Sequence, residues 1–263
     1  MTRKPTDMKH TVGATEKSVQ ILELICRCDG IRMSEICSKL DLSKSSVYSH
    51  LQTLHKAGFI VKEGEQYFIS VRMLWFAEHA RTRKDEYELA RRKVDQLVEE
   101  TGEEATFAVP ENYRPVVYYR ALPTDDNPTF LQGKRTHMHD AAVGKAMLAE
   151  FDNDEIERAV DLWGLPESTE HTITSKEALY EEVEQVRERG YATLDEEFAN
   201  GLRSVAASVT YPEGRLFGAL SIIAPAYRVS IDALETKLAP KVVATTTKLE
   251  EQVADQVPPY SER

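Results

Sequence analysis

A chain of 263 residues that is 41% hydrophobic and 29% charged is long enough for two domains, and it can bury hydrophobic cores while staying in solution. Residues 1–13 are polar, and no apolar run reaches the roughly 18 residues of a membrane span. These features argue against a secreted or membrane protein. We therefore expect a cytoplasmic protein without membrane contact.

The net charge of −11 is unevenly distributed along the chain. Residues 1–70 carry 10 Lys and Arg and 8 Asp and Glu, a net charge of +2, whereas residues 71–263 carry 23 and 36, a net charge of −13. A strongly acidic surface discourages non-specific contact with nucleic acid. A nucleic-acid-binding segment is therefore expected within the first 70 residues.

The three cysteines, Cys26, Cys28 and Cys37, all lie in this N-terminal part. An odd number without a signal peptide argues against a disulfide framework, and their spacing lacks the fourth ligand of a zinc site. We expect them to be small buried residues of a helical core.

Three helices are predicted before residue 60. The first begins at Thr15 as N-cap and carries Val19, Leu22, Ile25 and Cys26 at helical spacing, until Asp29-Gly30 ends it. A short second helix starts near Ser34. Ser43 then caps a third helix that runs to Gly58.

The third helix has one apolar stripe and one polar stripe. Val47, Leu51 and Leu54 form the apolar stripe, and Ser45, Tyr48, Ser49 and Gln52 form the polar one. Solvated helix faces usually carry Glu and Lys, whereas a stripe of hydroxyls, a phenol and an amide suits base edges and phosphates. The polar stripe therefore predicts a recognition helix.

Two short apolar runs, residues 59–61 and 67–69, follow this helix and flank the polar residues 62–66. They predict a hairpin, so that residues 1–70 read as a winged helix-turn-helix. The expected DNA contacts are Ser43, Lys44, Ser45, Ser46, Tyr48, Ser49, Gln52 and Lys62.

Residues 71–84 are expected to be a linker helix, with helical signal from 73 to 80. Asp85-x-x-Glu88 predicts a capping box for the next helix, which ends at Gly102. Its apolar face, Ala90, Val94, Leu97 and Val98, is long enough to pack against a second copy of the chain.

Residues 85–263 are expected to form one mixed domain. Strands are predicted at 105–109, 115–120, 191–194, 204–210 and 216–223, and helices at 141–151, after Asp152, after Thr174 and at 231–256. Runs of strands with helices beside them indicate an α+β fold around one sheet.

His137-x-His139-Asp140 admits two interpretations. Alternating residues on a strand would place both histidines on one face, as metal ligands need, but no third ligand stands at a suitable spacing. A hydrogen-bonding loop is the favoured interpretation. Gly144-Lys145 lacks the glycine-rich approach of a phosphate loop, and common hydrolase and zinc-protease motifs are absent. We expect no catalytic residue, metal or cofactor.

Ordered motifs over nearly the whole chain resemble the IclR family of regulators. They are residues 34–36, 42–48, 51–54 and 58–59, then His139 with 142–149, 172–174, 189–192, 195–197, 201–203, 206–207, 218–221 and Pro225. The resemblance implies a GAF-like effector domain with a central antiparallel sheet, a homodimer or dimer of dimers, and double-stranded operator DNA and a small-molecule effector as partners. Members of the family act as repressors, activators or both.

The resemblance also implies an effector site. Its expected residues are Ala142, Val143, Gly144, Leu194, Asp195, Ser204, Ser221 and Ile223. Members that sense small carboxylates commonly have Cys at the position of Ser204 and polar residues at Leu194 and Ile223. With those two positions apolar, a ligand with one polar end and a hydrophobic body is expected, its polar end at the start of the 141–151 helix.

A second departure from the family lies in the recognition helix, where Ser49 stands at a position that is Arg in many members. Two other functions stay open at this point. One is a metabolite sensor or an enzyme of the GAF-like class without a direct DNA role. The other is a scaffold whose helix-turn-helix contacts proteins.

Overall fold

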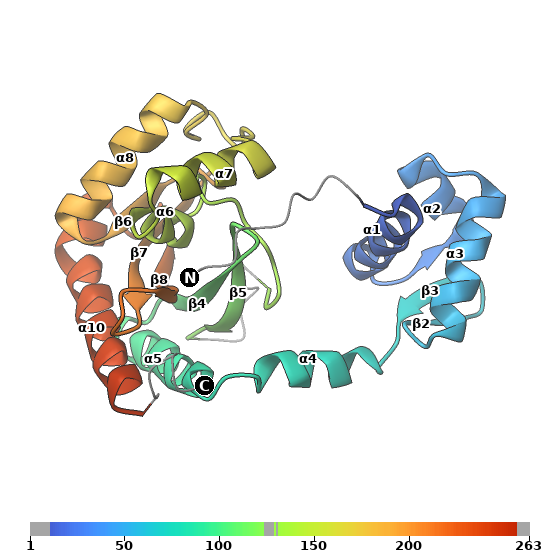
Figure 1. Cartoon of the computed structure of the whole chain (residues 1–263), viewed down its shortest axis with the longest axis horizontal. Helices are drawn as coiled ribbons and strands as arrows, with labels where there is room; N and C mark the ends of the chain where they lie inside the picture. The colour runs from blue at the N-terminus through green and yellow to red at the C-terminus, as the bar shows by residue number, and fades with distance from the viewer. Residues whose placement is uncertain (1–10, 124–128, 130, 257–263) are drawn as a thin grey trace. The chain divides into compact units, whose positions relative to one another are not determined.

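The computed structural model describes residues 11–123, 129 and 131–256, and the chain divides into two compact units between Arg83 and Lys84 (Figure 1). Within these ranges no helix has the length and apolar character that a membrane crossing needs. The division falls at one end of the expected linker, residues 71–84, and the assignment of that segment as a linker stays a prediction.

The N-terminal unit contains three helices and a small antiparallel sheet of order β1-β3-β2. Its elements are α1 (Gly13–Cys28), β1 (Ile31–Arg32), α2 (Met33–Leu40), α3 (Lys44–Lys56), β2 (Ile60–Glu63), β3 (Gln66–Ile69) and α4 (Met73–Arg81). This arrangement confirms the predicted winged helix-turn-helix. The short strand β1 escaped prediction because two residues carry no periodicity.

Apolar side chains at helical spacing hold α1, α2 and α3 together. Ile21, Ile36, Val47 and Leu51 are completely buried in one cluster. The Ser43 hydroxyl accepts a hydrogen bond from the Ser46 amide at 3.3 Å, which confirms the predicted cap of α3.

Two expectations for α1, and the expectation that the cysteines are buried, were wrong. The helix starts at Gly13 rather than at Thr15, because the Val12 carbonyl already accepts hydrogen bonds from the amides of Thr15 and Glu16. Val19 and Cys26 are exposed, and Ile21 takes the core position. The other two cysteines are only half-buried, and all three are free thiols.

Helix α4 packs against the segment between α3 and β2, at the base of the β2–β3 hairpin that forms the wing. The rings of Phe59 and Phe76 stack with centroids 5.5 Å apart, and the Arg72 guanidinium donates to the Ala57 carbonyl. Beside this contact, the side chains of Leu74 and Trp75 are each 66% exposed. The helix therefore presents an apolar surface that its own unit leaves uncovered.

The C-terminal unit has a five-stranded antiparallel sheet of order β5-β4-β8-β7-β6. Its elements are α5 (Glu86–Thr101), β4 (Glu104–Glu111), β5 (Arg114–Ala121), α6 (Ala142–Ala149), α7 (Asn153–Trp163), α8 (Lys176–Arg189), β6 (Ala192–Asp195), β7 (Leu202–Thr210), β8 (Leu216–Pro225), α9 (Ile231–Ala233), the π-helical turn η1 (Leu234–Leu238) and α10 (Ala239–Gln256). The predicted α+β class is confirmed.

Helices cover both faces of this sheet (Figure 1). Alternate residues of β7 face opposite sides: Val205 and Val209 pack with α5 and α10, whereas Ala206 packs with α6 and α8. Each face thus has its own core, and the second face holds the site described below.

The apolar face of α5 is not free for a second copy. Ala90, Val94 and Leu97 are completely buried against the sheet of their own unit. A helical stripe shows that a face is covered without showing by what, and here the covering is intramolecular.

Of three expected helix caps in this unit, one is confirmed and two are wrong. Asp152 forms the expected capping box with Glu155. Asp85 lies in helical conformation and makes no capping bond, and α8 is capped by Ser175 instead of Thr174, through the Ala178 amide at 3.2 Å. The long closing helix is interrupted by η1, which periodicity does not reveal.

Candidate functional site

The polar stripe of α3 lies on the surface of the N-terminal unit. Ser45, Tyr48, Ser49 and Gln52 are all exposed, and the Tyr48 side chain is 55% exposed although it is aromatic. The Ser49 hydroxyl donates to the Ser45 carbonyl at 3.0 Å, so it is partly used within the helix. The face therefore offers a phenol and an amide as its longest free groups.

The remaining expected DNA contacts flank this stripe. Ser43 and Lys44 are exposed at the start of α3, while Ser46 is half-buried. Lys62 lies on strand β2 of the wing, with its ammonium 5.7 Å from the centre of the Tyr67 ring. Lys44 and Lys62 are thus exposed cations at the start of α3 and on the β2–β3 hairpin.

A cavity on the α6 side of the sheet, here called the sheet pocket, collects most of the expected effector residues. It holds about 340 Å³ of space free of protein atoms, part of it open to solvent. Its lining residues are Thr106, Val117, Thr136, Ala141, Ala142, Val143, Leu194, Leu202, Ser204, Ser221 and Ile223.

Antiparallel register explains why these distant residues meet. Ser204 on β7 stands opposite Leu194 on β6 and Ile223 on β8, and Ser221 on β8 stands opposite Thr106 on β4. Directly opposed residues share a sheet face. The sheet therefore forms one wall of the pocket, and the start of α6 forms another.

The two pocket serines already have hydrogen-bond partners. Ser204 donates to the Ile222 carbonyl at 2.8 Å, and the hydroxyls of Ser221 and Thr106 are 2.7 Å apart. Thr136 differs: it is 3% exposed, and its Oγ1 finds no partner among the described residues. A buried hydroxyl without a partner costs about 1–3 kcal/mol, so a ligand that bonds to Thr136 gains by satisfying it.

The N-terminus of α6 adds a second polar feature. Ala141 precedes the helix in extended conformation and, as alanine, provides no side-chain cap. The first amides of an α-helix have no partner inside the helix and carry partial positive charge. Ala141, Ala142 and Val143 line the pocket, so an acceptor or anionic group is favoured there.

Two of the eight expected effector residues lie elsewhere. Gly144 is glycine because a Cβ there would sit 2.4 Å from the Met138 carbonyl oxygen, so its small size serves backbone packing. Asp195 is exposed and bonds Arg203 at 2.6 Å. Sequence reasoning missed Thr106, Val117, Thr136, Ala141 and Leu202, of which only Thr106 had a signal, its alternation with the core residues of β4.

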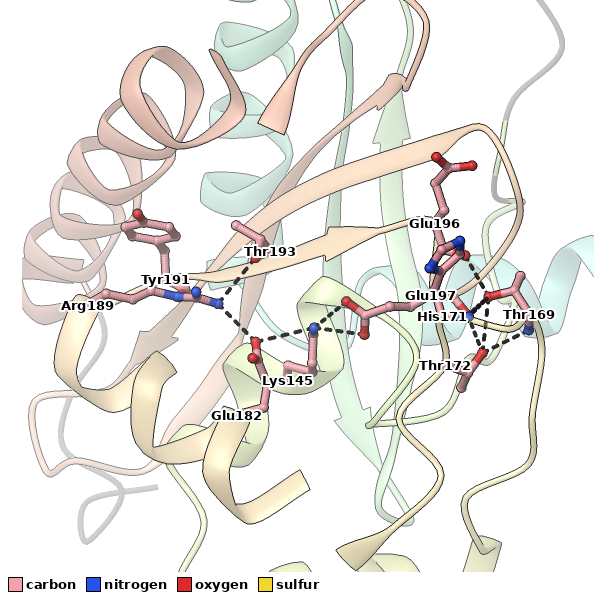
Figure 2. A network of polar contacts seen from close by, with 10 residues as sticks. All are labelled: Lys145, Thr169, His171, Thr172, Glu182, Arg189, Tyr191, Thr193, Glu196 and Glu197. Atoms are coloured by element: carbon pink, nitrogen blue, oxygen red, sulfur yellow. Dashed lines mark hydrogen bonds and ion pairs between the residues drawn. The ribbon is translucent and has the colours of Figure 1, made fainter. Parts of the chain in front are cut away.

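A partly buried ionic network ties α6 to its neighbours (Figure 2). Lys145 is 2% exposed, and its ammonium lies 2.7 and 2.8 Å from the carboxylate oxygens of Glu197 and 3.3 Å from Glu182. Arg189 also bonds Glu182, at 2.9 Å. Burial raises the pKa of Glu197, and the Lys145 charge opposes that shift.

The histidine segment forms a hydrogen-bonded loop instead of a strand. His139 is buried and its Nε2 is 3.0 Å from the Pro166 carbonyl oxygen, while the His137 Nδ1 lies 3.4 Å from Asp140. Burial lowers the pKa of His139. The histidines are thus occupied in holding the loop that precedes α6, as the favoured interpretation expected.

A winged helix-turn-helix with an exposed polar recognition face, followed by a unit with a partly open pocket on its central sheet, defines a ligand-responsive DNA-binding transcription regulator. Two family models match the chain: the IclR helix-turn-helix domain over residues 14–64, and the bacterial transcriptional regulator IclR C-terminal domain over residues 79–251. The chain belongs to the IclR family.

Individual relatives agree with this assignment. The HTH-type regulator KdgR of Escherichia coli is 31% identical over 87% of this chain and 88% of its own length. A solved IclR regulator from Alicyclobacillus acidocaldarius shares the fold, with a TM-score of 0.75, 22% identity and coverage of 92% and 99%. A double mutant of the PobR inducer-binding domain from Acinetobacter, in complex with 3-hydroxybenzoic acid, matches 64% of this chain and 98% of its own, with a TM-score of 0.59 and 25% identity.

Proposed function

We propose that α3 reads operator DNA through Tyr48 and Gln52, with Lys44 and Lys62 on phosphates, and that an effector in the sheet pocket controls this binding. The observation that supports the DNA contacts is the exposed, uncharged stripe beside the buried Val47 and Leu51. The other expected contacts, Ser43, Ser45, Ser46 and Ser49, are short and suit backbone phosphates.

Tyr48→Ala and Gln52→Ala are each expected to weaken operator binding by about 1–3 kcal/mol and to relax sequence preference, because base-edge contacts are lost. Lys44→Ala should weaken binding to all sequences and make the salt dependence shallower by about one unit of slope. Footprinting and salt titrations on the DNA upstream of the gene for this chain measure both effects.

Lys17→Ala is the matched control for Lys44→Ala, because it removes an exposed cation from α1, outside the stripe. Its operator affinity should stay that of the wild type. An unchanged footprint in both Tyr48→Ala and Gln52→Ala would show that another surface reads the DNA.

The pocket supports an effector with an acidic or acceptor end and an apolar body. The start of α6 and the Thr136 hydroxyl favour the polar end, while Leu194, Leu202 and Ile223 offer apolar walls. The 3-hydroxybenzoic acid bound to the PobR domain has this character. Compact acids such as glyoxylate would leave the apolar walls uncovered and should bind more weakly.

A homodimer, alone or as a dimer of dimers, completes the proposal. One winged helix covers too little DNA for tight specific binding, and two-fold sites need half-sites about one helical turn apart. The exposed apolar residues of α4, among them Leu74 and Trp75, supply a surface that a second copy can bury.

Trp75→Glu is expected to dissociate this dimer, since a carboxylate cannot be buried unpaired at an apolar interface. Sedimentation equilibrium at micromolar concentration should show a dimer for the wild type and a monomer for the variant. Val19→Glu, at a position that is 47% exposed on α1, is the control and should stay dimeric. A monomeric wild type with full operator affinity would contradict the proposal.

We propose that the chain acts by binding and not by catalysis, because the relatives it resembles are named as transcriptional regulators. Because operator DNA is its proposed partner, we place it in the cytoplasm. A chain that bound effector but no DNA in the footprinting experiment would instead favour a sensor or an enzyme.

A further inference from the structure

A second cavity, here called the outer cavity, adjoins the sheet pocket. It holds about 590 Å³ of space free of protein atoms, part of it open to solvent, and it is lined among others by Glu104, Leu202, Ile223 and Arg228. Leu202 and Ile223 also line the sheet pocket, so the two cavities are neighbours that share these side chains as walls.

Glu104 is an unusual residue to line such a cavity. It is only 7% exposed, and its Oε2 accepts a hydrogen bond from the Thr129 amide at 3.1 Å. Its Oε1 is buried and has no hydrogen-bond partner in the described part of the chain. A buried acceptor of this kind is costly unless a donor reaches it, and the cost is larger for a charged oxygen.

Among the described residues that line this cavity, the cation Arg228 is already engaged. The Arg228 guanidinium forms an ion pair with Glu103, the neighbour of Glu104 in the chain. An ion pair to a separate carboxylate leaves Glu104 Oε1 unsatisfied. The donor that completes this site is therefore expected from a bound molecule.

Strand geometry sets the spacing between the two polar features. Glu104 and Thr106 lie two residues apart on β4, so they share a sheet face and stand roughly 6–7 Å apart along the strand. Thr106 lines the sheet pocket, and Ile223, the register partner of Glu104, lines both cavities. This spacing is within the length of an ordinary metabolite.

We infer that the effector has two different polar ends: an acidic or acceptor end in the sheet pocket, and a hydrogen-bond donor, an ammonium or hydroxyl, at Glu104 in the outer cavity. This inference rests on the proposed effector site and specifies the chemical class of the effector that binds there. The apolar residues Leu202 and Ile223 contact the body of the molecule between its ends.

Calorimetric titration of the full chain with two scaffolds tests this ligand class. The aliphatic probes are hexanoate, 6-aminohexanoate and adipate, and the aromatic probes are benzoate, 4-(aminomethyl)benzoate and terephthalate. On at least one scaffold the amino acid should bind at least about tenfold more tightly than its parent acid, because it adds a charge-assisted hydrogen bond to Glu104. The diacid should bind more weakly than the parent, since it brings a second carboxylate to Glu104.

Glu104→Gln keeps the size of the side chain and an acceptor for the Thr129 amide, but it exchanges the free acceptor for a donor. In this variant the amino acid should bind about as tightly as its parent acid, and the diacid should become the preferred ligand. Glu111→Gln, at the exposed end of the same strand, is the control and should keep the wild-type order.

Each outcome separates this inference from the proposed function. Parent acids that bind as tightly as the amino acids, and that lose binding in Ser221→Phe, would overturn the donor end while supporting the sheet pocket. An amino-acid preference that persists in Glu104→Gln would overturn the role of Glu104. Binding by none of the six probes would overturn the two-ended ligand, whereas DNA recognition is judged separately by footprinting.

Discussion

Lys145→Met is expected to destabilise the C-terminal unit by about 3–5 kcal/mol, because it leaves the largely buried Glu197 carboxylate without its cation beside Glu182, which keeps Arg189. Methionine keeps most of the side-chain volume, so a cavity contributes little. Urea denaturation followed by Trp163 fluorescence measures the loss. In a Trp75→Phe background Trp163 is the single tryptophan of the chain, and it reports on its own unit.

The loss should depend on pH in a defined direction. Burial already raises the pKa of Glu197, and removing the Lys145 charge that opposes this shift raises it further. A carboxyl group whose pKa is higher in the folded state binds protons preferentially there, so its folded state gains stability as pH falls toward the unfolded pKa. The deficit of Lys145→Met relative to the wild type should therefore be smaller at pH 5 than at pH 8.

Lys176→Met provides the matched control, since Lys176 pairs with Glu157 at the surface and both side chains are more than 40% exposed. Exposed pairs contribute about 0–1 kcal/mol, so this variant should unfold close to the wild type. Lys145→Met combined with Glu197→Gln should recover part of the loss. Equal urea midpoints for Lys145→Met and Lys176→Met would show that the buried network does not stabilise the unit.

Much of the fold could be predicted because strong periodicity reports burial directly. The Val47/Leu51/Leu54 stripe gave the correct inner face of α3, and alternation gave the strands of the sheet. Periodicity does not identify the partner of a buried face, and for this reason the Ala90/Val94 face of α5 was wrongly assigned to a second copy. Termini such as Thr15 and Thr174 were displaced because neighbouring residues compete as caps.

The residues of the candidate pocket were predicted mainly from the family resemblance and not from local sequence patterns. Ser204, Ser221 and Ile223 lie on two strands whose register no local pattern specifies, yet the structure places all three on its wall. Thr136 and Glu104 could not be found from sequence, since an unsatisfied buried oxygen is a property of packing. Gly144 is not among the lining residues of the pocket, and the glycine there accommodates the Met138 backbone; glycine in a sequence signals a close approach without saying whether ligand or backbone approaches.

Ser221→Phe is expected to abolish the effector response while operator binding stays at the wild-type level. The phenyl ring would occupy the sheet pocket, which Ser221 lines together with Thr106 and Ser204. Overpacking of this kind costs about 1–3 kcal/mol, which a folded domain commonly tolerates. Gel shifts with and without a binding acid from the probe series measure the response.

Two further variants separate pocket occupancy from a general effect on the domain. Val143→Phe fills the pocket from the α6 side and should also abolish the response, whereas Ser208→Phe places the same ring on the same face of β7 outside the pocket and should retain it. In the wild type the effector should change operator affinity by about 1–3 kcal/mol, and operator DNA must change effector affinity by the same factor. Because both Ser221→Phe and Val143→Phe fill the sheet pocket, a response retained in both variants would place the effector outside it.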